Sequence, residues 1–310
     1  MNLPRAGLYR LLPTEQPNLN ARRIDRESSL TIVRKMNRGD QRAAEAVGRE
    51  AKNIARAAEI VAEGLRSGGR IFFVGAGTSG RLCVMEAAEC PNTFGIAPAR
   101  MQALMAGGNA SVFRSREGAE DDSKDGARQV SRRAKAGDVV VGVAASGVTP
   151  FVYGALRAAQ GRRCRTILVT SNSKPRMPKA DVIVCPRVGP EIVAGSTRLK
   201  AGTAAKLALN TLTTVAMIRL GKVYAGWMVD LKATSRKLRL RAARMVCRLG
   251  KVRPADAEAL LRHTGGSVKT AVLAARMRHG TMAERAARSR KLLETCDGSL
   301  TLALERLGKL

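Results

Sequence analysis

"RIFFVGAGTSGR", residues 70–81, decides the fold of this chain. The stretch begins with a short run of large apolar residues and passes directly into a glycine-rich turn. A run of four to eight apolar residues ending in glycine is typical of a strand buried on both faces, as in a parallel sheet. We therefore predict a buried strand over 70–75, a tight turn, and a helix beginning near Ser79.

Four more runs have the length and composition of buried strands. They are "DVVVGVAAS" (138–146), "TILVTS" (166–171), "DVIVCP" (181–186) and a weaker "MQALMAG" (101–107). The clearer runs are separated by stretches with helical periodicity, and this alternation is typical of α/β folds. The sequence predicts an open, central parallel sheet with helices on both faces.

Helical periodicity dominates the regions outside the predicted sheet. Residues 40–69 and 203–221 each have apolar residues at helical spacing and end in glycine, as expected just past a helix C-terminus. From about Thr234 we predict three or four short amphipathic helices, broken at Pro254, Gly265, Gly266 and Gly280. We divide the chain into an N-terminal extension and helix (1–37), a ligand-binding α/β domain (38–230) and a C-terminal helical subdomain (231–310).

The charge of the chain is strongly unbalanced. Its 310 residues include 55 Lys and Arg but 25 Asp and Glu, a formal net charge of +30. Such a surface attracts polyanions. However, the basic residues are spread along helical stretches, and aromatic residues, which would stack on bases, make up only 3% of the chain. We therefore do not expect specific binding of nucleic acid.

Cysteine and histidine usage gives no sign of a metal site. The six cysteines form no CxxC pair, and only two histidines are present. Reduced, mostly buried thiols are the expected state. No apolar run approaches the roughly 20 residues that a membrane helix needs, and the N-terminus lacks the apolar segment of a signal peptide. We expect a cytoplasmic protein without a metal.

Three loops that follow predicted strands or precede a predicted helix are rich in glycine and hydroxyl groups: 75–81, 144–150 and 195–204. In open α/β sheets, ligands bind outside the carboxyl ends of the strands. Glycine permits close backbone approach, and hydroxyls with helix N-terminal amides hold anions. The predicted phosphate-binding residues are Gly77, Thr78, Ser79, Ser146, Gly147, Thr149, Ser196 and Thr197. The alternative for any one loop is that its Ser or Thr only caps a helix.

Lys200 follows the third loop. It is a candidate partner for the phosphate or for a sugar oxygen, although lysine is also an ordinary residue at the start of a helix.

Two glutamates are candidates for proton transfer. Glu89 lies in "MEAAECPNTFG" (85–95) among small apolar residues, and Glu120 lies in the acidic stretch "REGAEDD" (116–122). Beside a sugar phosphate, such a pair supplies the general acid and general base needed to remove a proton next to a carbonyl and expel an oxygen leaving group. The alternative for Glu120 is a solvated acidic turn.

These stretches together resemble a known family. "GAGTSGRLCVMEAAECPNTFG", "REGAEDD", "DVVVGVAASGVTP", "VGPEIVAGSTRLKAGTAAKLALNTLTTVAMIRLGKVY" and "MVDLKAT" are similar to the N-acetylmuramic acid 6-phosphate etherases of the sugar isomerase (SIS) superfamily. The resemblance extends from about residue 14 to 280. It departs from the usual family pattern at Val148, where arginine is common, and in "EAAECPNT" and "TSRKL".

The resemblance implies an SIS-type αβα sandwich in a cytoplasmic homodimer, with 38–230 as its SIS domain. The implied reaction cleaves the D-lactyl ether of N-acetylmuramic acid 6-phosphate, as in peptidoglycan recycling, without metal or organic cofactor. By motif position, Glu120 is the base at C2 and Glu89 is the acid that later activates water. We expect Ala87, Ala88, Cys90 and Pro91 to desolvate Glu89 and keep it protonated.

Two alternatives come from the same superfamily. A non-catalytic SIS-domain regulator would bind sugar phosphates without cleaving them; the presence of both Glu89 and Glu120 counts against it. An aldose–ketose isomerase often uses histidine to open the ring, and here His263 and His279 lie in the C-terminal helical region.

Overall fold

The computed structural model describes residues 11–308, so the first ten residues of the predicted N-terminal extension lie outside the described part. Five strands form one parallel sheet in the order β2-β1-β3-β4-β5. They are β1 (Ile71–Gly75), β2 (Met101–Met105), β3 (Val139–Val143), β4 (Arg165–Val169) and β5 (Val182–Val184). All five predicted strand regions are confirmed, including the weakest at 101–107.

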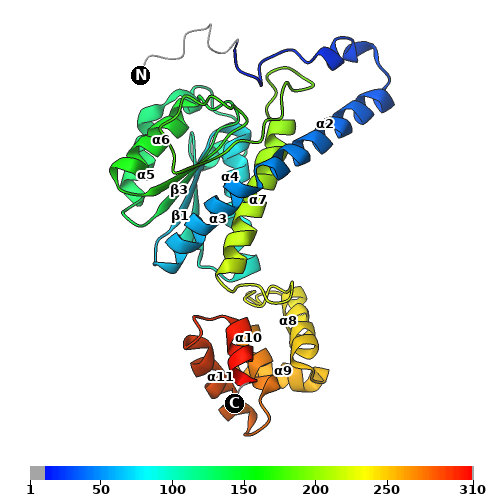
Figure 1. Cartoon of the computed structure of the whole chain (residues 1–310), viewed down its shortest axis with the longest axis vertical. Helices are drawn as coiled ribbons and strands as arrows, with labels where there is room; N and C mark the ends of the chain where they lie inside the picture. Colours follow the sequence, from blue (N-terminus) through cyan, green and yellow to red (C-terminus); the bar gives the residue numbers. More distant parts are fainter. Residues whose placement is uncertain (1–10, 309–310) are drawn as a thin grey trace. The chain divides into compact units, whose positions relative to one another are not determined.

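Helices cover both faces of the sheet (Figure 1). On one face, α5 (Ser123–Arg133) and α6 (Pro150–Gly161) pack on alternate strand residues such as Phe72, Val140 and Leu168. On the other face, α3 (Ala51–Arg66) contacts β1, β3 and β5. Successive strand residues point to opposite faces, so a sheet covered on both sides has strands that are apolar throughout.

The strand order reverses direction between β1 and β3. The chain moves outward from β1 to β2 on one side and then from β3 to β5 on the other. Loops that leave the carboxyl ends of the strands on either side of such a switch point diverge and open a crevice. The loops after β1 and β3 are the first and second predicted phosphate loops, so the topology supports a ligand site between them.

The helix predicted over 40–69 is in fact two helices. α2 (Ser29–Arg49) begins at the N-cap Ser28, and α3 begins after a break at Glu50. The carboxylate of Glu50 accepts hydrogen bonds from the side chain of Asn53 and from the backbone of Cys185, just after β5. Glu50 therefore links the junction of α2 and α3 to the end of β5. The N-terminal half of α2 extends beyond the sheet (Figure 1).

Two further long helices are α4 (Gly77–Phe94) and α7 (Lys200–Arg219). Short 3-10 turns connect the elements: η1 (Leu19–Ala21), η2 (Ile24–Arg26), η3 (Pro98–Arg100), η4 (Asn109–Val112) and η5 (Ala119–Asp121). None of the described helices is both long and apolar enough to cross a lipid bilayer.

The C-terminal region contains more helices than predicted. It has α8 (Arg236–Gly250), α9 (Pro254–His263), α10 (Val268–Arg276), α11 (Met282–Glu294) and α12 (Leu300–Leu307), five in all within the described residues. The predicted breaks are present, but the break at Asp297 and Gly298, both with positive φ, was missed. α10 is buried along almost its whole length and forms the centre of this core.

Internal contacts divide the chain into two compact units. Within the described residues, one comprises 11–88 together with Pro98–Val215, and the other comprises Glu89–Ala97 together with 216–308. The three-part division at residues 37 and 230 stays a prediction.

Candidate active site

The first predicted phosphate loop is formed by close approach of α4 to the end of β1. A Cβ atom on Gly80 would lie 2.7 Å from the carbonyl oxygen of Gly75, and one on Gly75 would lie 2.8 Å from the amide of Gly80. Gly77, at the first position of α4, has a φ of 53°. Only glycine satisfies all three positions without strain. The first-turn amides of α4, including those of Thr78 and Ser79, have no carbonyl partner within the helix, which suits them to an anion.

The second loop follows β3 and is fixed by the segment after β4. Gly147 has a φ of 68°, and the side chain of Asn172 donates to the backbone oxygen of Ser146 at 2.8 Å. Thr149 occupies the N-cap position of α6, yet its hydroxyl makes no capping hydrogen bond. The capping alternative therefore does not account for Thr149. Val148, where the family commonly has arginine, is buried.

At the third loop we predicted helix amides open to a phosphate, but a carboxylate of the chain itself binds the N-terminus of α7. The buried carboxylate of Glu191 accepts hydrogen bonds from the backbone amides of Lys200 (3.0 Å) and Ala201 (2.9 Å), the first two residues of α7. These two amides are thus unavailable to a ligand. Ser196 and Thr197 are half-buried on the same loop, and their hydroxyls remain candidates for phosphate binding.

The first and third loops lie next to each other. A Cβ atom on Gly202 in α7 would lie 3.5 Å from the methyl carbon of Thr78 and 3.4 Å from the carbonyl oxygen of Thr197. The second loop leaves β3, which pairs directly with β1. The structure therefore brings all three hydroxyl-rich loops to one edge of the sheet.

Lys200 is directed toward its own loop. Its ammonium group donates to the carbonyl oxygens of Val188 and Pro190, both at 2.7 Å. Burial lowers the pKa of Lys200 below its ordinary value, an effect that nearby Glu191 opposes and Arg42 reinforces. These contacts show that Lys200 fixes the conformation of its own loop. A contact between Lys200 and the phosphate of a substrate stays a prediction.

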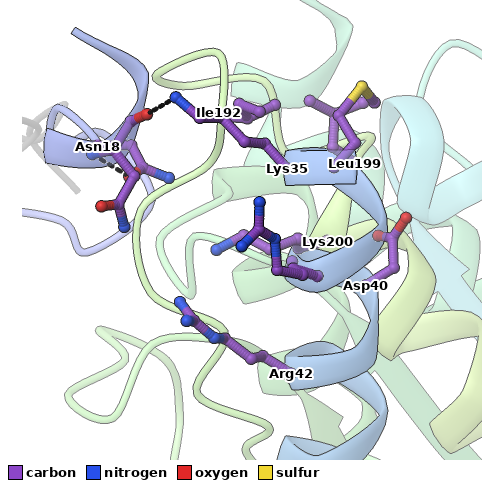
Figure 2. Close-up of a pocket in the computed structure, with 11 residues that line it drawn as sticks. Asn18, Lys35, Asp40, Arg42, Ile192, Leu199 and Lys200 are labelled. Atoms are coloured by element: carbon purple, nitrogen blue, oxygen red, sulfur yellow. Dashed lines mark hydrogen bonds between the residues drawn. The ribbon is translucent and has the colours of Figure 1, made fainter. Parts of the chain in front are cut away.

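Lys200 also lines a basic pocket of about 350 Å³ beside α2. Figure 2 shows Lys35, Asp40 and Arg42 of α2 around this pocket. Lys35 is paired with Glu27, and Lys200 is bonded to the loop carbonyls.

Glu120 lies on η5, after β2, in the first unit. The side chain is accessible to solvent, but partial desolvation raises the pKa of Glu120 above its ordinary value, and the neighbouring acids Asp121 and Glu117 raise it further. A carboxylate with a raised pKa is a stronger base than an ordinary glutamate. This supports a role for Glu120 in proton abstraction rather than only a solvated turn.

Glu89 is not enclosed as predicted. It lies near the C-terminal end of α4, in the second unit, and is exposed. The reason is helical geometry: residues one or two positions away point to other sides of the helix, so Ala87, Ala88, Cys90 and Pro91 do not surround it. The convergence of Glu89 with Glu120 on one substrate stays a prediction.

Cysteines and acids form no metal centre in the described part of the chain. Between residues 11 and 308, no group of three or more His, Cys, Asp or Glu side chains could hold a metal ion. None of the six cysteines forms a disulfide bond, and four of them are buried. Burial raises the pKa of Cys164 to about 11, so this thiol is protonated and unreactive at neutral pH.

Sequence reasoning missed Glu191, the residue that caps α7. Its only local signal is "GPE" before a glycine- and hydroxyl-rich loop. Asn172, which orders the second loop from the end of β4, was also missed; an Asn directly after a strand is the signal that could have identified it.

The fold and the three loops define an SIS-type sugar-phosphate protein. Residues 53–160 match the model of the glucokinase regulatory protein N-terminal SIS domain. A phosphoheptose isomerase from Francisella tularensis has a similar fold, with a TM-score of 0.50 at 18% identity, covering 62% of this chain and all of that one.

Relatives of much higher identity specify the family. An N-acetylmuramic acid 6-phosphate etherase from Symbiobacterium thermophilum is 51% identical over 81% of this chain and 84% of its own length. Another, from Gloeobacter violaceus, is 46% identical over 96% of each chain. This chain therefore belongs to the N-acetylmuramic acid 6-phosphate etherase family, a family of enzymes and not of SIS-domain regulators.

Proposed function

We propose that the chain cleaves N-acetylmuramic acid 6-phosphate into N-acetylglucosamine 6-phosphate and D-lactate. The observation that carries the proposal is the convergence of three hydroxyl-rich loops at the carboxyl edge of the sheet, in a chain that retains both Glu89 and Glu120. The loops suit the 6-phosphate, and the carboxylates suit proton transfer at C2 and C3 of the sugar.

Phosphate binding uses the first two loops most directly. Thr78 and Ser79 offer hydroxyls together with α4 amides, and Ser146, Gly147 and Thr149 face the same switch point from β3. Ser196 and Thr197 contribute hydroxyls from the third loop. Several neutral donors at a helix N-terminus hold a phosphate dianion without a metal.

The first chemical step is elimination. Ring opening leaves an aldehyde at C1, which makes the C2 proton acidic. Glu120 removes this proton, and Glu89 protonates the ether oxygen at C3 as the C3–O bond breaks and lactate leaves. The raised pKa of Glu120 matches the base role.

The second step is the addition of water. Glu89, now a carboxylate, takes a proton from water as the hydroxide forms a bond to C3, and Glu120 returns its proton to C2. The net reaction consumes one water, and both glutamates end in their starting states. No redox group takes part in this sequence.

We also propose that the protein acts as a cytoplasmic homodimer. α2 exposes Leu30, Val33 and Met36 at intervals of three residues, with exposed fractions of 59%, 60% and 37%. An apolar stripe of this kind on a helix favours association with another surface. Cysteines without disulfide bonds and a phosphorylated substrate both suit a reducing, intracellular compartment.

The decisive experiment measures D-lactate after incubation of the purified protein with N-acetylmuramic acid 6-phosphate. Wild type should release lactate, and both Glu89→Gln and Glu120→Gln should lose activity by at least about 100-fold. Glu45→Gln, at an exposed glutamate on α2, is the matched control and should remain active. A wild type that binds the substrate but releases no lactate would replace this proposal with the sensor alternative.

A further inference from the structure

Arg81 connects the first phosphate loop to the chain that leads to Glu120. It lies in the second turn of α4, two residues after Ser79. Its Nε donates to the carbonyl oxygen of Val112 at 2.8 Å, and its Nη2 donates to that of Ser111 at 3.1 Å and to the hydroxyl of Ser115 at 3.4 Å. Half-buried Arg81 thus contacts three residues that lie 30, 31 and 34 positions further along the chain.

The two carbonyls belong to the last residues of η4. Carbonyl groups at a helix C-terminus have no partner within the helix, and a cation placed there both satisfies them and complements the helix dipole. Arg81 therefore fixes the end of η4.

The segment between η4 and Glu120 has few other anchors. Residues 113–118 are exposed, and Phe113 is 90% exposed. Beyond Glu120 the chain is held well, because Asp122 caps α5 and η5 packs against α6. Arg81 supplies the anchor on the preceding side, so the position of Glu120 depends on a tie at each end.

We propose that Arg81 is a positioning residue that sets the place of the base Glu120 relative to the phosphate loop. Thr78, Ser79 and Arg81 all lie in the first two turns of α4. The same helix would therefore position both the substrate phosphate and the base. The inference rests on the proposed function for the identity of the base. It assigns Arg81 no contact with substrate.

The test compares Arg81→Met and Arg81→Lys in the full chain, with N-acetylmuramic acid 6-phosphate as substrate. A small displacement of a catalytic group costs about 100-fold in rate, so Arg81→Met should lower kcat by about that factor while KM changes less than about threefold. Lysine can donate to one or both carbonyls, so Arg81→Lys should recover part of the loss. The acid limb of the pH–rate profile should also move, because the surroundings of Glu120 change.

Arg100→Met is the matched control. Arg100 is another half-buried arginine, and it donates to the backbone carbonyls of Gly69 and Leu65. It directly precedes β2 and so lies at the amino ends of the strands, away from the loops at their carboxyl ends. It should lower thermal stability while leaving kcat within about twofold. A loss of kcat in Arg81→Met no larger than in Arg100→Met, or a rise in KM alone, would overturn the proposal.

Amide hydrogen exchange separates this inference from the proposed reaction. In Arg81→Met, the amides of residues 109–116 should exchange faster than in wild type, whether or not the protein releases lactate. Unchanged exchange of these amides would show that the hydrogen bonds from Arg81 do not hold η4 in place. Lactate release by wild type, measured in parallel, tests the reaction independently.

Discussion

The carboxylate of Glu191 accepts a hydrogen bond from the amide of Ala201 at 2.9 Å, at the N-terminus of α7. The site is one that an anion would otherwise occupy, and here the chain supplies its own. The neighbouring amide of Lys200 is bonded to the same carboxylate, while the Lys200 ammonium holds the carbonyls of Val188 and Pro190. These bonds make the third loop a preorganised structure before any ligand binds.

Replacement of Glu191 should destabilise the protein. Glu191→Ala leaves one buried and one partly buried amide without an acceptor and should cost about 2–4 kcal/mol in the free energy of unfolding, measured by denaturant titration. Glu191→Gln retains one acceptor and should cost less. Equal losses for the two variants would show that the carboxylate acts by packing alone.

The contribution of Glu191 to the free energy of unfolding should also depend on pH. Burial raises the pKa of Glu191 above 4.5, despite the amides of Ala201 and Lys200. The folded state therefore holds this proton more tightly than the unfolded state, and the associated stability is present at low pH and lost as pH rises through the raised value. The stability of wild type relative to Glu191→Gln should fall across that window; a constant difference would contradict the shift.

Gly80→Ala should disrupt the first phosphate loop. Its Cβ would lie 2.7 Å from the Gly75 carbonyl oxygen, a backbone atom that cannot move without shifting β1 or α4. We expect a loss of about 2 kcal/mol or more in unfolding free energy and a clear rise in the Kd for N-acetylglucosamine 6-phosphate, measured by calorimetry.

Gly48→Ala is the control for that variant. Gly48 lies inside α2 with open space around its Cβ position and without a positive φ. Alanine is favoured over glycine in a helix, so this change should stabilise the protein by about 0.5–1 kcal/mol and leave ligand binding unaltered.

The strands could be predicted because a doubly covered parallel sheet leaves a continuous apolar run in the sequence. The position of the first two hydroxyl-rich loops could be predicted because they follow β1 and β3 directly, while their binding of phosphate stays a prediction. The Glu191 cap could not, since its partners lie nine and ten residues away and are reached only through the folding of the loop. The exposure of Glu89 was also missed, because adjacent residues in sequence point to different sides of a helix.

The stability of the C-terminal helical region should depend on Asp230. Its Oδ2 accepts bonds from Lys269 at 2.7 Å and Lys222 at 2.8 Å, and Lys269 is only 7% exposed. Asp230→Asn leaves the buried ammonium of Lys269 without its counter-charge and should cost about 3–5 kcal/mol. Lys269→Met should cost less, because Asp230 keeps Lys222. Thermal midpoints of the two variants in the opposite order would refute this ranking.

Glu120 should give the acid limb of the pH–rate profile. Partial desolvation, with Asp121 and Glu117, raises the pKa of Glu120 above 4.5, and a general base must be ionised, so kcat/KM should rise with pH through a midpoint above 4.5. Asp121→Asn and Glu117→Gln each remove a nearby negative charge that raises the pKa of Glu120, so each should move that midpoint down. Added salt should shrink the shift, because exposed charges are screened. An unmoved midpoint in both variants would assign the limb to another group and remove Glu120 from the role of base.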